Sequence, residues 1–110
     1  MATATYKVLA QSAPSATTAT DIYTVASATQ AVISTITVCN RGASTSTYRI
    51  AIRPNGATLA NQHYITYDAT VPANDTITLT LGMTADAADV VTVYASTANL
   101  SFNLFGTEIA

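Results

Sequence analysis

The sequence has one histidine, His63, and histidine is the side chain that most readily moves protons near neutral pH. A histidine can activate a serine or cysteine nucleophile when a tertiary fold brings the two together. The sequence contains no G-x-S-x-G pattern, which would expose a nucleophilic serine on a tight turn. Period-two alternation in segment 61–67 places His63 on the same strand face as Ile65 and Tyr67. We therefore expect His63 to be structural or exposed, and a small hydrolase is the least favoured hypothesis.

Acidic residues that could bind a cation are few and widely spaced. Asp86 and Asp89 lie three residues apart, whereas Asp68 and Asp75 stand alone. A calcium loop needs several oxygen ligands at short, regular spacing, and the D-x-D-x-D-G arrangement is missing. We expect Asp86 and Asp89 to keep a loop and the start of a strand soluble.

Cys39 is the single cysteine, so the chain cannot form an internal disulfide, and no second cysteine or nearby histidine supports metal or nucleophile chemistry. We expect it to be a small buried hydrophobic residue. The four glycines are isolated from one another, which excludes a glycine-rich phosphate loop. The sequence thus predicts no catalytic, cofactor-binding or metal-binding residue.

Arginine and tyrosine are the residue types with the strongest claim to a binding role, because both are enriched at protein interfaces. Arg49 and Arg53 share one face of a predicted strand and could pair with acidic groups of a partner or face solvent. Several tyrosines fall opposite the main apolar set of their strands, where edge packing would explain them equally well. The candidate interface residues are Tyr6, Lys7, Tyr23, Arg49, Arg53 and Tyr94.

These side chains must be positioned by strands, because apolar residues recur with a period of two. In segment 47–53, Tyr48, Ile50 and Ile52 share one face. Similar alternation predicts inward sets in segments 76–81 and 99–107. The inward residues of these two segments are Ile77, Leu79 and Leu81, and Leu100, Phe102 and Leu104, with Phe105 breaking the rule. Segments 6–9, 21–25, 31–40 and 90–95 are further predicted strands.

Proline, asparagine and glycine at regular intervals separate these strands, and only segment 57–62 could form about one helical turn. Seven to eight short strands at this spacing predict an all-β fold, either an antiparallel β-sandwich or a jelly-roll-like barrel. Segment 11–20 carries no periodic apolar signal, so we expect residues 1–20 to form a strand and an extended arm. Residues 21–110 are expected to form a single β-sandwich domain.

The amino-acid composition argues against several classes of function. Alanine and threonine occur 21 times each and serine eight times, while charged residues make up only 9% of the 110 residues. Four cations and a net charge of −2 argue against nucleic-acid binding. No apolar run is long enough to span a membrane, and the first ten residues lack the pattern of a secretory signal. A surface with so little charge is poorly protected against association, which suits a protein that functions in an assembly.

Seven stretches of the sequence resemble a group of small all-β virion proteins of tailed bacteriophages. These stretches cover nearly the whole chain and are residues 8–18, 21–25, 34–42, 48–54, 71–76, 89–97 and 100–109. The resemblance implies a structural part of the virion with no enzyme activity, and no catalytic or ligand-binding residues can be carried over from it. It leaves open whether the protein belongs to the capsid exterior, the neck or the tail. The single cysteine and the lack of a secretory signal pattern fit assembly in the host cytoplasm.

The leading hypothesis is a capsid decoration, or cement, protein that bridges major capsid subunits and associates with itself, with a trimer as the preferred form. The alternative is a neck, tail or tail-fibre component, including a module that binds a receptor or glycan. No cofactor is expected, and the expected partners are the major capsid protein or other virion proteins.

Overall fold

Threonine and branched aliphatic residues suit pleated strands, and they fill most of the regular structure of this chain. The computed structural model describes residues 2–110. Its strands are β1 (Ala4–Ser12), β2 (Thr20–Thr24), β3 (Gln30–Asn40), β4 (Ser46–Arg53), β5 (Tyr64–Val71), β6 (Thr76–Ala85), β7 (Val90–Ala95) and β8 (Leu100–Ile109). Two 3-10 helices, η1 (Pro54–Gly56) and η2 (Asn61–His63), lie between β4 and β5. Neither could cross a membrane, and the described residues contain no other helix.

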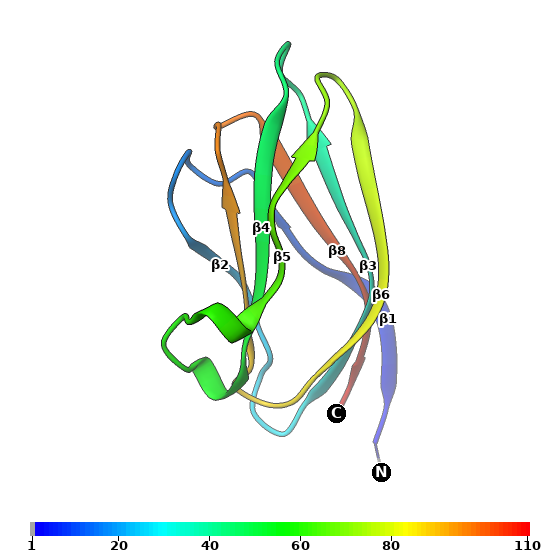
Figure 1. Cartoon of the computed structure of the whole chain (residues 1–110). Helices are drawn as coiled ribbons and strands as arrows, with labels where there is room; N and C mark the ends of the chain where they lie inside the picture. The colour runs from blue at the N-terminus through cyan, green and yellow to red at the C-terminus, as the bar shows by residue number, and fades with distance from the viewer. Residues whose placement is uncertain (1) are drawn as a thin grey trace.

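The eight strands form two four-stranded sheets, ordered β1-β8-β3-β6 and β2-β7-β4-β5. All pairings are antiparallel, and four of them are nested: β1 with β8, β2 with β7, β3 with β6, and β4 with β5. Figure 1 shows the sheets as two layers, with the N- and C-termini at the same end of the molecule. The predicted all-β, sandwich-like fold is confirmed.

The core lies between the two layers and comes from alternate residues of the strands. Leu100, Phe102 and Leu104 of β8 are fully buried, as their alternation predicts. The ring of Phe102 meets Tyr48 of β4 edge-on, with 6.4 Å between the ring centroids, so this pair joins the two sheets. Aromatic pairs of this geometry stabilise a core beyond the area that they bury.

The predicted inward position of Leu81 is wrong. Its side chain is 39% exposed, although Ile77 and Leu79 of the same strand are half-buried against the core. The pairing of β3 with β6 shifts register at this level, and Gly82 has a φ of +60°. This bulge adds a residue to β6 and breaks the alternation.

Residues 4–19 form an edge strand and a crossing loop. β1 is longer than the predicted strand at 6–9, because it pairs with β8 as far as Ser12. Residues 13–19 then cross to the other sheet, where Pro14 is buried and the Thr17 N–H donates to the Ala95 carbonyl. Hydrogen bonds to β8 and to Ala95 therefore attach this segment to the strands of the same chain.

The connection between β4 and β5 is less helical than predicted. Residues 57–60 have no regular structure, and only Asn61–His63 form a 3-10 turn. Asn55 and Gly56 both have positive φ, which is why the chain can reverse direction immediately after Pro54.

Candidate functional site

The outer face of the β2-β7-β4-β5 sheet gathers an arginine and several tyrosines. Tyr48 and Ile50 are buried in the core, so Arg49 between them projects outward. Its guanidinium carbon lies 4.1 Å from the ring centroids of both Tyr67 and Tyr94. Two aromatic rings therefore hold one cation, an arrangement that the ring quadrupoles favour.

Asp68 completes the surroundings of Arg49. Arg49 Nε donates to Asp68 Oδ1 over 2.7 Å, and Arg49 Nη2 lies 3.4 Å from Asp68 Oδ2. This hydrogen bond is the main reason why the pKa of Arg49 is raised. Asp68 has a φ of +52° at an irregular part of β5, and this local turn directs it toward Arg49. Asp68 thus neutralises the charge of Arg49, so the guanidinium is already paired and is a poor binding site for an anion.

Arg53 belongs to a second network on the same face. Its Nη2 lies 2.9 Å from Asp21 Oδ1, and its Nε donates to Thr92 Oγ1 over 3.0 Å. Thr92 is buried and donates its hydroxyl proton to the same Asp21 oxygen over 2.8 Å. Arg53 Nη1 also donates to the Ala57 carbonyl over 3.0 Å. Through these bonds Arg53 links the β4–β5 connection at Ala57 and the edge strand β2 at Asp21 to Thr92 in the central strand β7.

A cavity of about 160 Å³ opens beside Arg49. Tyr64 and Tyr94 contribute its aromatic lining, and Tyr64 meets Tyr67 edge-on at 4.9 Å. The complete lining consists of Ala19, Arg49, Ala51, Leu59, Tyr64, Thr92, Val93 and Tyr94. This set contains no histidine, cysteine or carboxylate, and the volume is below that of a drug-sized site. The cavity could accept one neutral ring or one side chain of a partner.

The structure thus brings together three of the predicted interface residues, Arg49, Arg53 and Tyr94, and separates the others. Tyr6 and Lys7 lie on β1 in the other sheet. Tyr23 is only 9% exposed and points into the core, so its placement on an outer surface is wrong. Register shifts in β2 between Asp21 and Tyr23, and this irregularity reverses the faces that simple alternation assigns.

Tyr23 forms a polar contact at the end of the core. Its hydroxyl donates to Glu108 Oε2 over 2.5 Å, and Lys7 Nζ donates to Glu108 Oε1 over 3.0 Å. Burial, and after it the hydrogen bond with Glu108, raises the pKa of Tyr23 well above its ordinary value. The hydrogen bond from Tyr23, and after it the one from Lys7, lowers the pKa of Glu108. These three residues link β1, β2 and β8.

His63 acts as a local cap. It is buried, and its Nδ1 accepts a hydrogen bond from the Ala60 N–H over 3.0 Å at the start of η2. This contact holds the imidazole ring at the start of η2, which agrees with the structural role expected from the sequence.

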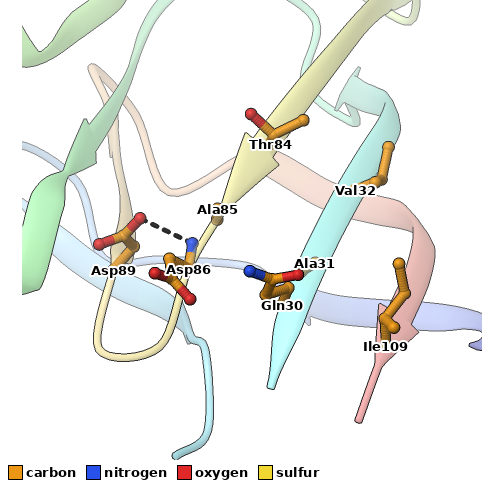
Figure 2. Close-up of a pocket in the computed structure, with 8 residues that line it drawn as sticks. All are labelled: Gln30, Ala31, Val32, Thr84, Ala85, Asp86, Asp89 and Ile109. Carbon is orange, nitrogen blue, oxygen red and sulfur yellow. Dashed lines mark hydrogen bonds between the residues drawn. The ribbon is translucent and has the colours of Figure 1, made fainter. Parts of the chain in front are cut away.

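Asp86 and Asp89 lie beside an open depression of about 370 Å³ between the ends of β3, β6 and β8 (Figure 2). Figure 2 shows Asp89 turned toward the backbone of Asp86, whose N–H donates to Asp89 Oδ2 over 2.8 Å. The other Asp89 oxygen accepts from the Asn55 N–H over 2.8 Å. The carboxylate of Asp89 therefore organises the 86–89 turn and ties it to η1. Within residues 2–110 no three His, Cys, Asp or Glu side chains are grouped so that they could hold a metal ion.

Cys39 is half-buried and outside the core, so the expectation that it is a buried hydrophobic residue is wrong. Val38 and Asn40 on either side of it are the buried positions of this part of β3. Cys39 therefore faces outward, beside Ser101 of β8 and Thr76 of β6.

Sequence reasoning missed Asp21, Tyr67, Asp68 and Thr92 as members of the sheet surface. Tyr67 and Asp68 follow one another in the sequence, but only the register of β4 with β5 and β7 shows that they surround Arg49. No local signal could have identified Thr92 among 21 threonines. Comparisons of the chain with protein-family models, with curated proteins and with solved structures found no match.

Proposed function

We propose that this protein is a non-enzymatic structural component of a tailed-phage particle, and specifically a decoration protein that binds the outside of the capsid shell. Its partners would be the major capsid protein and further copies of itself, with a trimer as the preferred form. Assembly would take place in the host cytoplasm. The resemblance of the sequence to phage virion proteins motivates this proposal, and the strand order supports it.

The nested pairing of β1 with β8, β2 with β7, β3 with β6 and β4 with β5 is the observation that carries the proposal. A long antiparallel hairpin that rolls up into two sheets produces this order, and we infer that the sandwich is a jelly roll. Jelly rolls are frequent in viral capsid and lectin domains. Because one fold can serve many functions, the test must be made on the particle itself.

A decoration protein acts by mass action, because ligands that bind only the mature shell stabilise it. The site residues fit such a role. The charged groups near Arg49 and Arg53 are paired within the chain, and a paired, rigid surface loses little conformational freedom on docking.

The decisive experiment counts copies of the protein in purified particles by quantitative mass spectrometry. Decoration of a symmetric shell requires on the order of hundreds of copies, whereas a neck or tail part requires about three to twelve. Empty expanded capsids should bind the added protein and resist heating better, by about 2.7 kcal/mol per site at a hundredfold excess over Kd. A low copy number, or no binding to the shell, would contradict the decoration role.

A second candidate is a glycan-binding module of a tail or fibre, favoured by the tyrosine-lined cavity of about 160 Å³ on the β2-β7-β4-β5 sheet. A neutral sugar ring would suit the rings of Tyr64 and Tyr94. Binding on a glycan array that is lost in Tyr64→Ala would support this function. An array without hits, together with tight capsid binding, would remove it.

A further inference from the structure

The outward positions of the paired strands in the β1-β8-β3-β6 sheet carry no charged side chain. The buried residues Ile36, Phe102 and Leu104 face the core, so their neighbours along β3 and β8 face outward. Read across the paired strands, fifteen of the outward positions form three rows of four and one row of three. They are Tyr6, Thr107, Val32 and Thr84; Val8, Phe105, Thr35 and Thr80; Gln11, Asn103, Thr37 and Thr78; and Ser101, Cys39 and Thr76. Ala4, Ile109 and Gln30 form a further row, and the exposed Leu81 and Ser34 lie at the bulges.

The charged groups nearest to this face lie at its borders or behind it, and Asp86 and Asp89 line the same depression as Val32 and Thr84 at one border. Lys7 and Glu108 pair with each other on the inner side of the sheet, where Glu108 meets Tyr23. Arg41 follows the end of β3, and its Nε donates to Ser101 Oγ over 2.9 Å. A partner that covers the whole face would therefore cover one cation, Arg41 beside Ser101, although none of the fifteen outward residues is itself charged.

One end of the face is apolar and exposed. Tyr6 is 85% exposed, and Val8, which borders the register shift of β1, is 47% exposed. Half-buried Phe105 lies directly beside Val8, and half-buried Val32 completes the row of Tyr6. Exposed apolar groups that adjoin one another are typical of a contact surface.

The remaining positions are complementary to themselves. Eleven of the fifteen side chains carry a hydroxyl or an amide, and each of these groups can both donate and accept a hydrogen bond. Threonines and asparagines of two copies can therefore pair with one another whichever residues meet across the contact, and none of them is repelled by its own counterpart near the twofold axis. The net charge of −2 resides elsewhere on the chain, so contact through this face keeps the acidic groups of two copies apart.

The area of the face is sufficient for a weak but specific contact. Four strands about 4.8 Å apart and eight residues at about 3.3 Å each cover roughly 500 Å² per copy. Two such faces would bury roughly 1,000 Å², which is the lower limit of a specific interface and typical of weak association.

We infer that two copies of this protein contact each other through the outward face of the β1-β8-β3-β6 sheet, a twofold contact that joins copies in pairs and does not by itself produce the trimer preferred above. The uncharged, self-complementary surface and its exposed Tyr6 and Val8 carry the inference. It deepens the proposed structural role and depends on that role only for the idea of self-association. The β2-β7-β4-β5 sheet is then left free for other partners.

The test is sedimentation analysis of the full chain from about 5 to 500 µM, a range that covers weak interfaces of this area. The wild type should associate within this range. Thr37→Glu and Thr37→Lys place a charge on an inner strand of the face, and each should weaken association at least about tenfold. An equimolar mixture of the two variants should recover most of the loss, because opposite charges then meet across the contact.

Thr70→Glu and Thr70→Lys are the matched controls, since Thr70 is exposed on β5 in the other sheet. They should associate like the wild type, and circular dichroism should show that all four variants are folded. A wild type that stays monomeric throughout, controls that dissociate as strongly as the Thr37 variants, or a mixture without recovery would overturn the inference.

The same variants separate this inference from the proposed function. A monomeric protein whose capsid binding is lost in Thr37→Glu would assign the face to a capsid subunit, overturning the contact between copies while leaving decoration intact. A protein that associates through this face but does not bind capsids would support the contact between copies and contradict the decoration role.

Discussion

The two sheets bury similar apolar residues between them, but their outer faces use polar side chains in opposite ways. On the β2-β7-β4-β5 sheet, Arg49 and Arg53 are each fixed by a carboxylate, and Arg49 also lies against two tyrosine rings. On the β1-β8-β3-β6 sheet, threonines and amides cover the surface without a charge. The first face stabilises the chain that carries it. The second face is the one through which we infer that copies of the protein contact each other.

The largest expected effect concerns the backbone that supports the uncharged face. A Cβ added at Gly106 would lie 1.9 Å from the Val32 carbonyl oxygen, so Gly106→Ala must push β8 away from β3. We expect a loss of about 3 kcal/mol in the free energy of unfolding, measured by urea denaturation. Gly82→Ala is the control, because a Cβ there meets nothing within 4 Å. Its positive φ should cost only about 1 kcal/mol, and equal losses would refute the steric argument.

A smaller effect is expected from the contact that closes one end of the core. Tyr23→Phe removes the hydrogen bond to Glu108 and should cost about 1–2 kcal/mol at neutral pH. The folded pKa of Glu108 is lowered, so its stabilising effect is present above the unfolded pKa and is lost as the pH falls through the folded pKa. The difference between wild type and variant should therefore shrink below about pH 4. A difference that does not change with pH would contradict the role of Glu108.

The same isosteric substitution compares the two faces directly. Thr92→Val removes a buried hydroxyl that joins Asp21 and Arg53, and we expect a loss of about 1 kcal/mol. Thr37→Val changes a half-buried, outward threonine on the uncharged face, and its effect on the monomer should stay within about 0.5 kcal/mol. Thermal denaturation at low protein concentration measures both values. Equal losses would show that the two faces contribute alike.

The smallest effect is expected for Arg49→Lys. Lysine keeps the charge but cannot pair with Asp68 through two nitrogen atoms or stack flat between Tyr67 and Tyr94. The melting temperature should fall slightly, and the ion-pair part of the difference should diminish at high salt because Arg49 and Asp68 are partly exposed. An Arg49→Lys protein that melts above the wild type would show that the cluster serves binding and not stability.

Much of the fold could be predicted from period-two alternation, and the failures share one cause. The inward residues of β8 and the outward position of Arg49 follow from simple alternation within regular strands. Leu81 and Tyr23 were assigned to the wrong surface because bulges in β6 and β2 shift the alternation by one residue. A bulge depends on the pairing with a neighbouring strand, which a single segment of sequence does not reveal.

The candidate site was predictable only in part, for a related reason. Arginine and tyrosine are residue types that suggest an interface, so Arg49, Arg53 and Tyr94 could be selected by type. Their partners Asp68 and Thr92 are ordinary residues in the sequence and acquire a role only through cross-strand neighbours.

The sequence by itself determined that the chain forms strands with one apolar side, because branched and hydroxyl-bearing residues alternate at the period of a pleated strand. It also determined the shortage of charge that makes association plausible. Only the tertiary structure decided which surfaces collect those few charges, because the register between strands distant in the sequence sets every neighbour on a sheet. That register gathers Arg49 and Arg53 on one face and leaves the paired outward positions of the other face without a charge, with Arg41 at its border.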